Sequence, residues 1–182
     1  HASFQVISAS TTDGFNTIDI NAMSYAGLTV IMVLMFIGAS PGSTGGGIKT
    51  TTFAIVTMYV GSLLKGRSNG VVNVYAREIN ADSVNKALGL FILFIIIVVF
   101  DLTIMNLTEN DDYIKQLFEV VSALSNTGLS TGITVHLSII SKLLLTITMF
   151  IGRVGPITFG YFIFGNKQVS VYQYPQEDVF VG

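Results

Sequence analysis

Hydrophobic residues fall in long blocks along this chain, separated by short polar segments. The apolar blocks cover 26–37, 53–64, 87–107 and 134 to about 165. The block at 87–107 holds a single charged residue, Asp101, and is long enough to cross a bilayer core of about 30 Å. Blocks of this length and composition predict membrane-spanning helices.

A glycine-rich polar segment, 38–49, interrupts what would otherwise be one helix over 20–64. Such a helix would measure about 67 Å at about 1.5 Å per residue, roughly twice the thickness of a bilayer core. The segment contains Pro41, which lacks an amide donor, and several glycines that disfavour continuous helix. Non-helical backbone at membrane depth is tolerated where other parts of the protein bury it or where it lines a water-filled cavity. We therefore expect a broken helix that lines an aqueous path.

Two short apolar segments, 4–9 and 118–123, each precede a small polar loop centred on a glycine, Gly14 or Gly128. The offset is 118 − 4 = 114, and 11 of the 35 positions in 4–38 are identical to their partners at this offset. We infer an internal repeat. One such helix and loop would suit a protein surface equally well. Its recurrence beside a second spanning helix favours a re-entrant pore helix followed by a filter loop.

The charges predict the orientation of the repeats. The connection 65–86 is rich in Lys and Arg, whereas the connection 108–115 carries three acidic residues. The positive-inside rule makes the first cytoplasmic and the second external. Both repeats then enter the membrane in the same sense, which suits rotation about an axis along the membrane normal and a central pore. Near the outer side, we expect Asp101 to form a structural ion pair, for which Lys115 is the candidate partner, rather than to act as an ion ligand.

Composition excludes several functional classes. Charged residues make up 11% of the 182 residues, mean hydropathy is +0.67, and there is no cysteine, so thiol catalysis, disulfides and thiolate metal sites are ruled out. A net charge of −2 without a basic, aromatic-rich cluster disfavours nucleic-acid binding. No catalytic triad or paired catalytic carboxylates can be recognised, and we expect no enzymatic activity.

Two further patterns bear on function. The segment 42–50 superficially resembles a phosphate-binding loop, but Ile48 separates Gly47 from Lys49, and that motif requires adjacent Gly and Lys. A nucleotide-binding enzyme is therefore disfavoured. The chain begins at His1, close to an apolar segment, and we expect it to be part of a longer polypeptide.

Three motifs together resemble the Trk/Ktr/HKT superfamily of potassium-transport proteins: Ser10–Thr17, Ser40–Thr50 and Gly152–Thr158. The closing stretch, 174–182, looks most like the Ktr membrane subunit. In that family, four helix–pore-loop–helix repeats on one polypeptide surround a single potassium pore. The resemblance covers the whole chain but only the third and fourth repeats. It implies an all-α integral membrane protein with potassium-channel-like repeats around a central pore.

The resemblance also implies which residues form the filter and the gate. Backbone carbonyls that bind K⁺, with no other metal site, would come from Thr12, Asp13, Gly14, Phe15, Asn126, Thr127, Gly128 and Leu129. The intramembrane gating loop falls on 38–49, and its gate residues would be Gly42, Ser43, Thr44, Gly45, Gly46, Gly47 and Lys49, with Arg153 from the last helix. Asp13 departs from the family, which more often has a small apolar residue there.

Arg153 can also be interpreted without the family. A central arginine costs about 2.5–3.5 kcal/mol on membrane-insertion scales, so it normally faces a cavity or a partner. We expect the partners to be carbonyls of the segment 42–47. The alternative is a side chain that extends to the inner membrane interface.

By resemblance, the chain is part of the ion-conducting subunit of a potassium uptake system in the inner (plasma) membrane of a bacterium. The domains would be 1–64 (third repeat), 65–86 (cytoplasmic connection), 87–165 (fourth repeat) and 166–182 (cytoplasmic tail). The implied partners are the missing first half of the pore, a second membrane subunit, a cytoplasmic RCK-type nucleotide-binding ring and the lipid bilayer. No cofactor is expected, and the passage of Na⁺ stays open. The alternative is a secondary cation transporter with a midplane site at the broken helix.

Overall fold

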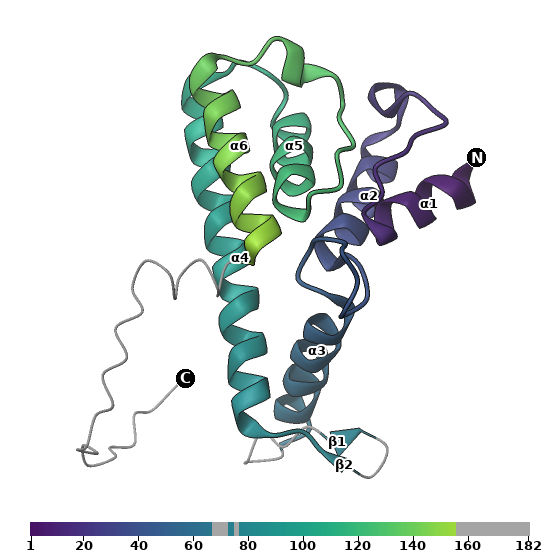
Figure 1. Cartoon of the computed structure of the whole chain (residues 1–182), viewed down its shortest axis with the longest axis vertical. Coiled ribbons are helices and arrows are strands. Elements are labelled where there is room, and N and C mark those ends of the chain that lie inside the picture. The colour runs from purple at the N-terminus through teal and green to yellow at the C-terminus, as the bar shows by residue number, and fades with distance from the viewer. Residues whose placement is uncertain (67–72, 75–76, 156–182) are drawn as a thin grey trace, which may run out of the picture.

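The structure, a computed structural model, describes residues 1–66, 73–74 and 77–155. Its described part is helical apart from a two-stranded ribbon (Figure 1). In chain order the elements are α1 (Ala2–Thr11), η1 (Ile20–Ala22), α2 (Tyr25–Ile37), α3 (Thr50–Leu64), β1 (Asn73–Val74), β2 (Arg77–Glu78), α4 (Ala81–Thr108), α5 (Tyr113–Ser125), η2 (Ile133–Val135) and α6 (Ile139–Val154). The strands pair antiparallel, Asn73 with Glu78 and Val74 with Arg77.

The internal repeat inferred from the sequence is present in three dimensions. Helix α2 begins at Tyr25 and helix α6 at Ile139, which keeps the offset of 114. Each is preceded by a serine, Ser24 or Ser138, whose hydroxyl accepts a hydrogen bond from an amide in the first turn. Such N-caps satisfy amides that have no partner within the helix. The two repeats therefore share helix boundaries and the local chemistry that sets them.

Helices α2 and α3 form the broken helix. They have 13 and 15 residues, and Figure 1 shows them one above the other with an irregular loop between them. Helix α4 has 28 residues and contains an 18-residue stretch with a mean hydropathy of 2.9. In the described part it is the one helix that is long and apolar enough to cross a membrane by itself. It begins six residues before the predicted 87 because the Asn80 side chain caps the Asp82 amide.

Helix α5 is the most buried element and packs against α2, α4 and α6. Its Phe118 belongs to an apolar cluster with Met35 of α2, and its Val120 belongs to a second cluster with Met105 of α4 and Leu145 of α6. Helix α5 starts at 113 rather than at the predicted 116, and α6 starts at 139 rather than at 134. The short η2 turn and the Ser138 cap delay α6. The predicted segments 156–165 and 166–182 lie outside the described residues.

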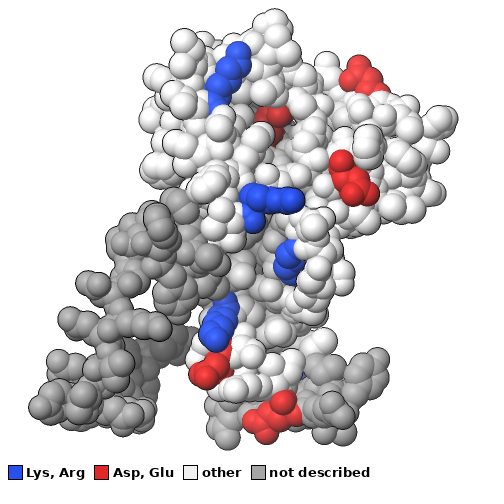
Figure 2. Space-filling view, viewed as in Figure 1, with Lys and Arg blue, Asp and Glu red and all other residues white. Residues whose placement is uncertain are grey.

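The outward faces of the long helices are apolar. Exposed aliphatic side chains on α4 and α6 include Ile92, Ile96, Val99 and Leu143. Figure 2 shows charged side chains that are sparse and well separated on an otherwise uncharged face. A surface of this kind suits lipid or further apolar protein rather than water.

Candidate functional site

The first loop (12–15) and the second loop (126–129) have the same backbone conformation. Thr12 and Asn126 end helices α1 and α5 in the left-handed region, with φ/ψ of 59°/34° and 54°/33°. Two residues later, Gly14 and Gly128 have φ of +78° and +87°. Glycine adopts these angles without the steric cost that a Cβ imposes. Each loop thus turns sharply away from the end of its helix.

A buried serine holds the far end of each loop. Ser8 Oγ donates to the Phe15 carbonyl and Ser122 Oγ donates to the Leu129 carbonyl, both at 2.6 Å. Among the described residues, no hydrogen bond reaches the carbonyl oxygens of Thr12, Asp13, Gly14, Asn126, Thr127 or Gly128. Unpaired carbonyl oxygens are the groups that can replace water around K⁺.

The two loops touch each other. A Cβ added to Gly14 would lie 1.9 Å from the Thr127 carbonyl oxygen, so only glycine permits this approach. The Thr11 hydroxyl donates to Asp13 Oδ2 at 2.9 Å, and at the same offset Ser125 Oγ lies 2.7 Å from Thr127 Oγ1. In the first loop, the Asp13 carboxylate therefore takes the place of a hydroxyl.

The glycine-rich loop (38–49) is attached both to α2 and to the first loop. The Ile48 amide donates to the Phe36 carbonyl at 3.1 Å, and the Gly46 amide donates to Thr12 Oγ1 at 3.0 Å. The Ile48 side chain is fully buried against Phe94 and Leu124. Most of this loop is therefore ordered by specific contacts, although its backbone is irregular.

Its glycines permit close backbone packing. A Cβ on Gly46 would lie 1.8 Å from the Ser125 carbonyl oxygen, and one on Gly47 would lie 2.6 Å from Gly38 Cα. By contrast, a Cβ on Gly42 would meet no atom within 4 Å. The sequence predicted these glycines as helix breakers, and the structure adds that two of them bring the loop against α2 and α5.

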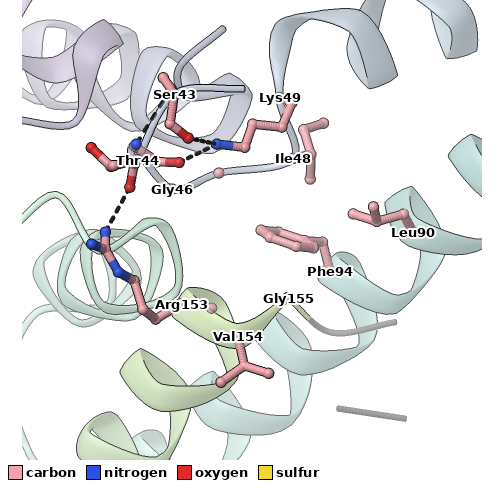
Figure 3. Close-up of a pocket in the computed structure, with 13 residues that line it drawn as sticks. Ser43, Thr44, Gly46, Ile48, Lys49, Leu90, Phe94, Arg153, Val154 and Gly155 are labelled. Atoms are coloured by element: carbon pink, nitrogen blue, oxygen red, sulfur yellow. Dashed lines mark hydrogen bonds between the residues drawn. The ribbon is translucent and has the colours of Figure 1, made fainter. Parts of the chain in front are cut away.

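Two cationic side chains bind carbonyls of this loop. Lys49 Nζ contacts the Ser43 carbonyl at 3.3 Å and also the Gly45 carbonyl, and Arg153 Nη1 donates to the Thr44 carbonyl at 2.6 Å (Figure 3). The predicted contact between Arg153 and carbonyls of 42–47 is thus confirmed. The carbonyl oxygens of residues 43–45, which could otherwise bind a free cation, thus contact the positively charged side chains of Lys49 and Arg153.

Cavities lie on both sides of the glycine-rich loop. One of about 610 Å³ lies between this loop and the first loop, and its lining residues are Ser10, Thr11, Thr12, Asp13, Gly38, Ala39, Ser40, Ser43, Thr44, Gly45, Thr50 and Arg153. A second of about 410 Å³ is lined by residues 43–49 together with Leu90 and Phe94 of α4 and the end of α6 (Figure 3). The first cavity therefore brings together part of the predicted site: Thr12 and Asp13 of the first loop, residues 43–45 of the glycine-rich loop, and Arg153. The predicted residues Gly14 and Phe15 are not among its lining residues, and Lys49 lines the second cavity instead.

The predicted ion pair of Asp101 and Lys115 does not form. Asp101 is 2% exposed and its Oδ2 accepts a hydrogen bond from Thr148 Oγ1 of α6 at 2.6 Å. Lys115 donates instead to Asn21 Oδ1 at 2.7 Å. The reason is helical phase, because Asp101 lies on the face of α4 that packs against α6.

Two acidic residues of the connection 108–115 form hydrogen bonds with the beginnings of helices α2 and α6. Tyr25 Oη donates to Asp112 Oδ2 at 2.8 Å, and this hydrogen bond is the main cause that lowers the pKa of the Asp112 carboxyl. Hydrogen bonds from Ser138 and Ser141 likewise lower the pKa of Glu109. Both carboxylates thereby connect segments far apart in the sequence.

Three further residues that hold the loops, Ser8, Ser122 and Glu119, were not predicted from the sequence. The two serines were visible as identical residues at the offset of 114, but their hydrogen bonds depend on how each loop folds back over its helix. Glu119 is buried in α5, and its carboxylate accepts hydrogen bonds from residues just beyond the second loop. The sequence feature that could have pointed to Glu119 is an acidic residue inside an apolar stretch.

Comparisons with known proteins identify the family of this chain. A family model described as TrkH, cation transport protein, matches residues 1–164. The chain is 43% identical over 175 residues to the Ktr system potassium uptake protein D of Bacillus subtilis, covering 96% of this chain and 38% of that protein. It is 35% identical over 181 residues to the Ktr system potassium uptake protein B of Vibrio alginolyticus, covering 100% and 39%.

A solved structure shows the same fold. The crystal structure of the potassium transporter TrkH from Vibrio parahaemolyticus matches with a TM-score of 0.70 at 24% sequence identity, covering 90% of this chain and 36% of that one. The predicted all-α membrane fold is therefore confirmed. The chain spans less than two fifths of the length of these relatives.

Proposed function

Because the chain belongs to the TrkH family of cation transport proteins, we propose that it forms the third and fourth pore repeats of a potassium uptake subunit. The observation that carries this proposal is the duplicated loop, with its left-handed cap, positive-φ glycine and serine contact at a constant offset. Its relatives are named as potassium uptake proteins. Transport here requires no catalysed chemical reaction and no cofactor on this chain.

In this proposal, half of the filter consists of the first loop and the second loop. Their carbonyls replace the hydration shell of K⁺, and the ion is cargo rather than a resident metal. The glycines at 14 and 128 permit the required backbone turns. Sodium discrimination would depend on how firmly these carbonyls are held apart.

We further propose that the glycine-rich loop is the gate. It borders the cavity below the first loop, which Arg153 also lines, and Lys49 lines the second cavity. The positive charges of both side chains, which bind carbonyls of this loop, oppose the passage of cations. Opening would displace the loop and break these contacts. The cavity behind the loop leaves room for such a movement.

The first test compares K⁺ and Na⁺ uptake by the full-length subunit in proteoliposomes, wild type beside Gly128→Ser. A side chain at φ of +87° strains the second loop and changes its carbonyl positions, so we expect the preference for K⁺ to weaken. Gly61→Ser is the matched control, because a Cβ there meets no atom within 4 Å and Gly61 lies in α3.

Intact selectivity in a folded Gly128→Ser protein would contradict the filter assignment. The site would then be sought at the broken helix, as expected of a secondary transporter with a midplane site. Single-channel recording separates these two mechanisms, since a pore gives discrete conductance steps and a carrier cycle does not.

The second test deletes Gly42–Gly47. Removing this part of the barrier is expected to raise K⁺ flux. The control is Gly61→Ala, a change in α3 outside the loop where a Cβ meets no atom within 4 Å, and it should retain the wild-type flux. If the folded deletion protein conducts at the wild-type rate, the loop is not the gate.

We propose the following assembly for the whole protein. The first half of the pore is supplied by further sequence, the membrane subunits pair, and a cytoplasmic nucleotide-binding ring of the RCK type acts on the gate from the side of the connection 65–86. The location would be the inner membrane of a bacterium, in keeping with the sources of the relatives.

A further inference from the structure

Glu119 is a buried carboxylate with a full set of hydrogen-bond donors. It lies in α5 and is 5% exposed. Its Oε1 accepts from Ser130 Oγ at 2.8 Å, from the Thr131 amide at 2.8 Å and from Thr131 Oγ1 at 2.9 Å. Its Oε2 accepts from Thr134 Oγ1 at 2.9 Å. Hydrogen bonds to an ionised acceptor are about twice as strong as neutral ones.

These contacts fix the stretch that leaves the second loop. Ser122 follows Glu119 by three residues, so both side chains lie on one face of α5. Ser122 holds the Leu129 carbonyl, and Glu119 holds the next residues, Ser130 and Thr131. One helix face therefore fixes three consecutive residues of the chain that continues from Gly128.

The first repeat lacks this anchor. The partner of Glu119 at the offset of 114 is Gln5, which is 2% exposed. Neither polar atom of its side chain has a hydrogen-bond partner among the described residues. Where the second repeat has donors at 130, 131 and 134, the first has Asn16, Thr17 and Ile20, and none of these bonds to Gln5. The first loop is held by Ser8 without a carboxylate behind it.

We infer that Glu119 is a positioning residue that makes the second loop the more rigid part of the filter. This rigidity determines the preference for K⁺ over Na⁺. The inference rests on the proposed ion pathway. On the cavity-size account of selectivity, a cage of carbonyls discriminates against the smaller ion when the backbone cannot close in around it. Four hydrogen bonds donated to one carboxylate resist such a movement in the second loop. In the first loop, Gln5 accepts no equivalent hydrogen bonds among the described residues.

The test measures K⁺ uptake in proteoliposomes against increasing competing Na⁺, with the full-length subunit. Glu119→Gln keeps the shape but removes the charge, and we expect the K⁺/Na⁺ preference to fall about tenfold, as for the loss of one charge-assisted hydrogen bond. Thr134→Val removes one donor and leaves three, so a smaller change in the same direction is expected. Maximal K⁺ uptake without Na⁺ should change less than the preference in both variants.

Gln5→Met is the matched control, because it changes the equivalent position of the other repeat, where no hydrogen bond is lost. Its preference should equal that of the wild type. If folded Glu119→Gln keeps the wild-type preference, or if Gln5→Met loses as much, the anchor role is refuted. If Glu119→Gln does not fold, Thr134→Val replaces it: a lower K⁺/Na⁺ preference supports the anchor role, and an unchanged preference refutes it. A wild type with no K⁺ preference would instead refute the proposed function.

Discussion

Gly14 is a residue at which the first loop and the second loop approach each other closely. Its positive φ and the Thr127 carbonyl oxygen 1.9 Å from its would-be Cβ are two separate reasons for glycine at this position. Gly42 has a similar φ of +82° but open space around it. A comparison of Gly14 with Gly42 therefore distinguishes the cost of backbone strain, which both positions have, from the cost of steric contact between the repeats, which only Gly14 has.

We predict that Gly14→Ala destabilises the protein more than Gly42→Ala does. The left-handed conformation costs each alanine about 1–2 kcal/mol, and the clash with Thr127 adds about 1–3 kcal/mol at position 14 alone. Thermal unfolding of the detergent-solubilised full-length subunit measures the difference. Equal melting temperatures would mean that the first and second loops do not meet as described.

At the scale of elements, the sequence predicted those features that depend on local composition. The apolar block at 87–107 predicted α4, and the identities at an offset of 114 predicted the paired short helices α1 and α5, the loops that follow them and α6. Glycines at 14 and 128 indicated unusual backbone angles, because few other residues adopt them. These signals lie within a few residues of the feature that they predict.

Features that depend on contacts between elements could not be predicted in this way. The partner of Asp101 is set by the face of α4 that meets α6, and the α4 start is set by the Asn80 cap. The close packing of Gly46 on Ser125 requires α5 to lie beside the glycine-rich loop. The role of Glu119 depends on how the chain folds back after the second loop.

For the whole molecule, the carboxylates Glu109 and Asp112 make stability depend on pH. Hydrogen bonds in the folded state lower both pKa values below the ordinary 4.5 and 3.8. Their stabilisation is therefore complete above these ordinary values and is lost as pH falls through the lower folded-state values. We predict a melting temperature that is steady from about pH 7 to pH 5 and decreases below about pH 4.

A variant identifies the source of this pH dependence. Glu109→Gln should melt at a lower temperature at neutral pH and should show a smaller decrease in acid. Asp82→Asn, a change at an exposed residue on the connection 65–86, should leave the acid-dependent decrease as in the wild type. The contrary result, an unchanged profile in Glu109→Gln, would assign the pH dependence to other carboxyls.

The contact of Gly14 with Thr127 has a direction, since a glycine of one repeat meets a carbonyl of the following repeat. Such a head-to-tail contact is heterologous and does not close on itself in a pair. A Cβ on Gly128, the partner of Gly14 at the offset of 114, would meet no atom within 4 Å, so Gly128 makes no such contact among the described residues. In the proposed pore, this is the position at which a further repeat would meet the second loop, as the second loop meets Gly14.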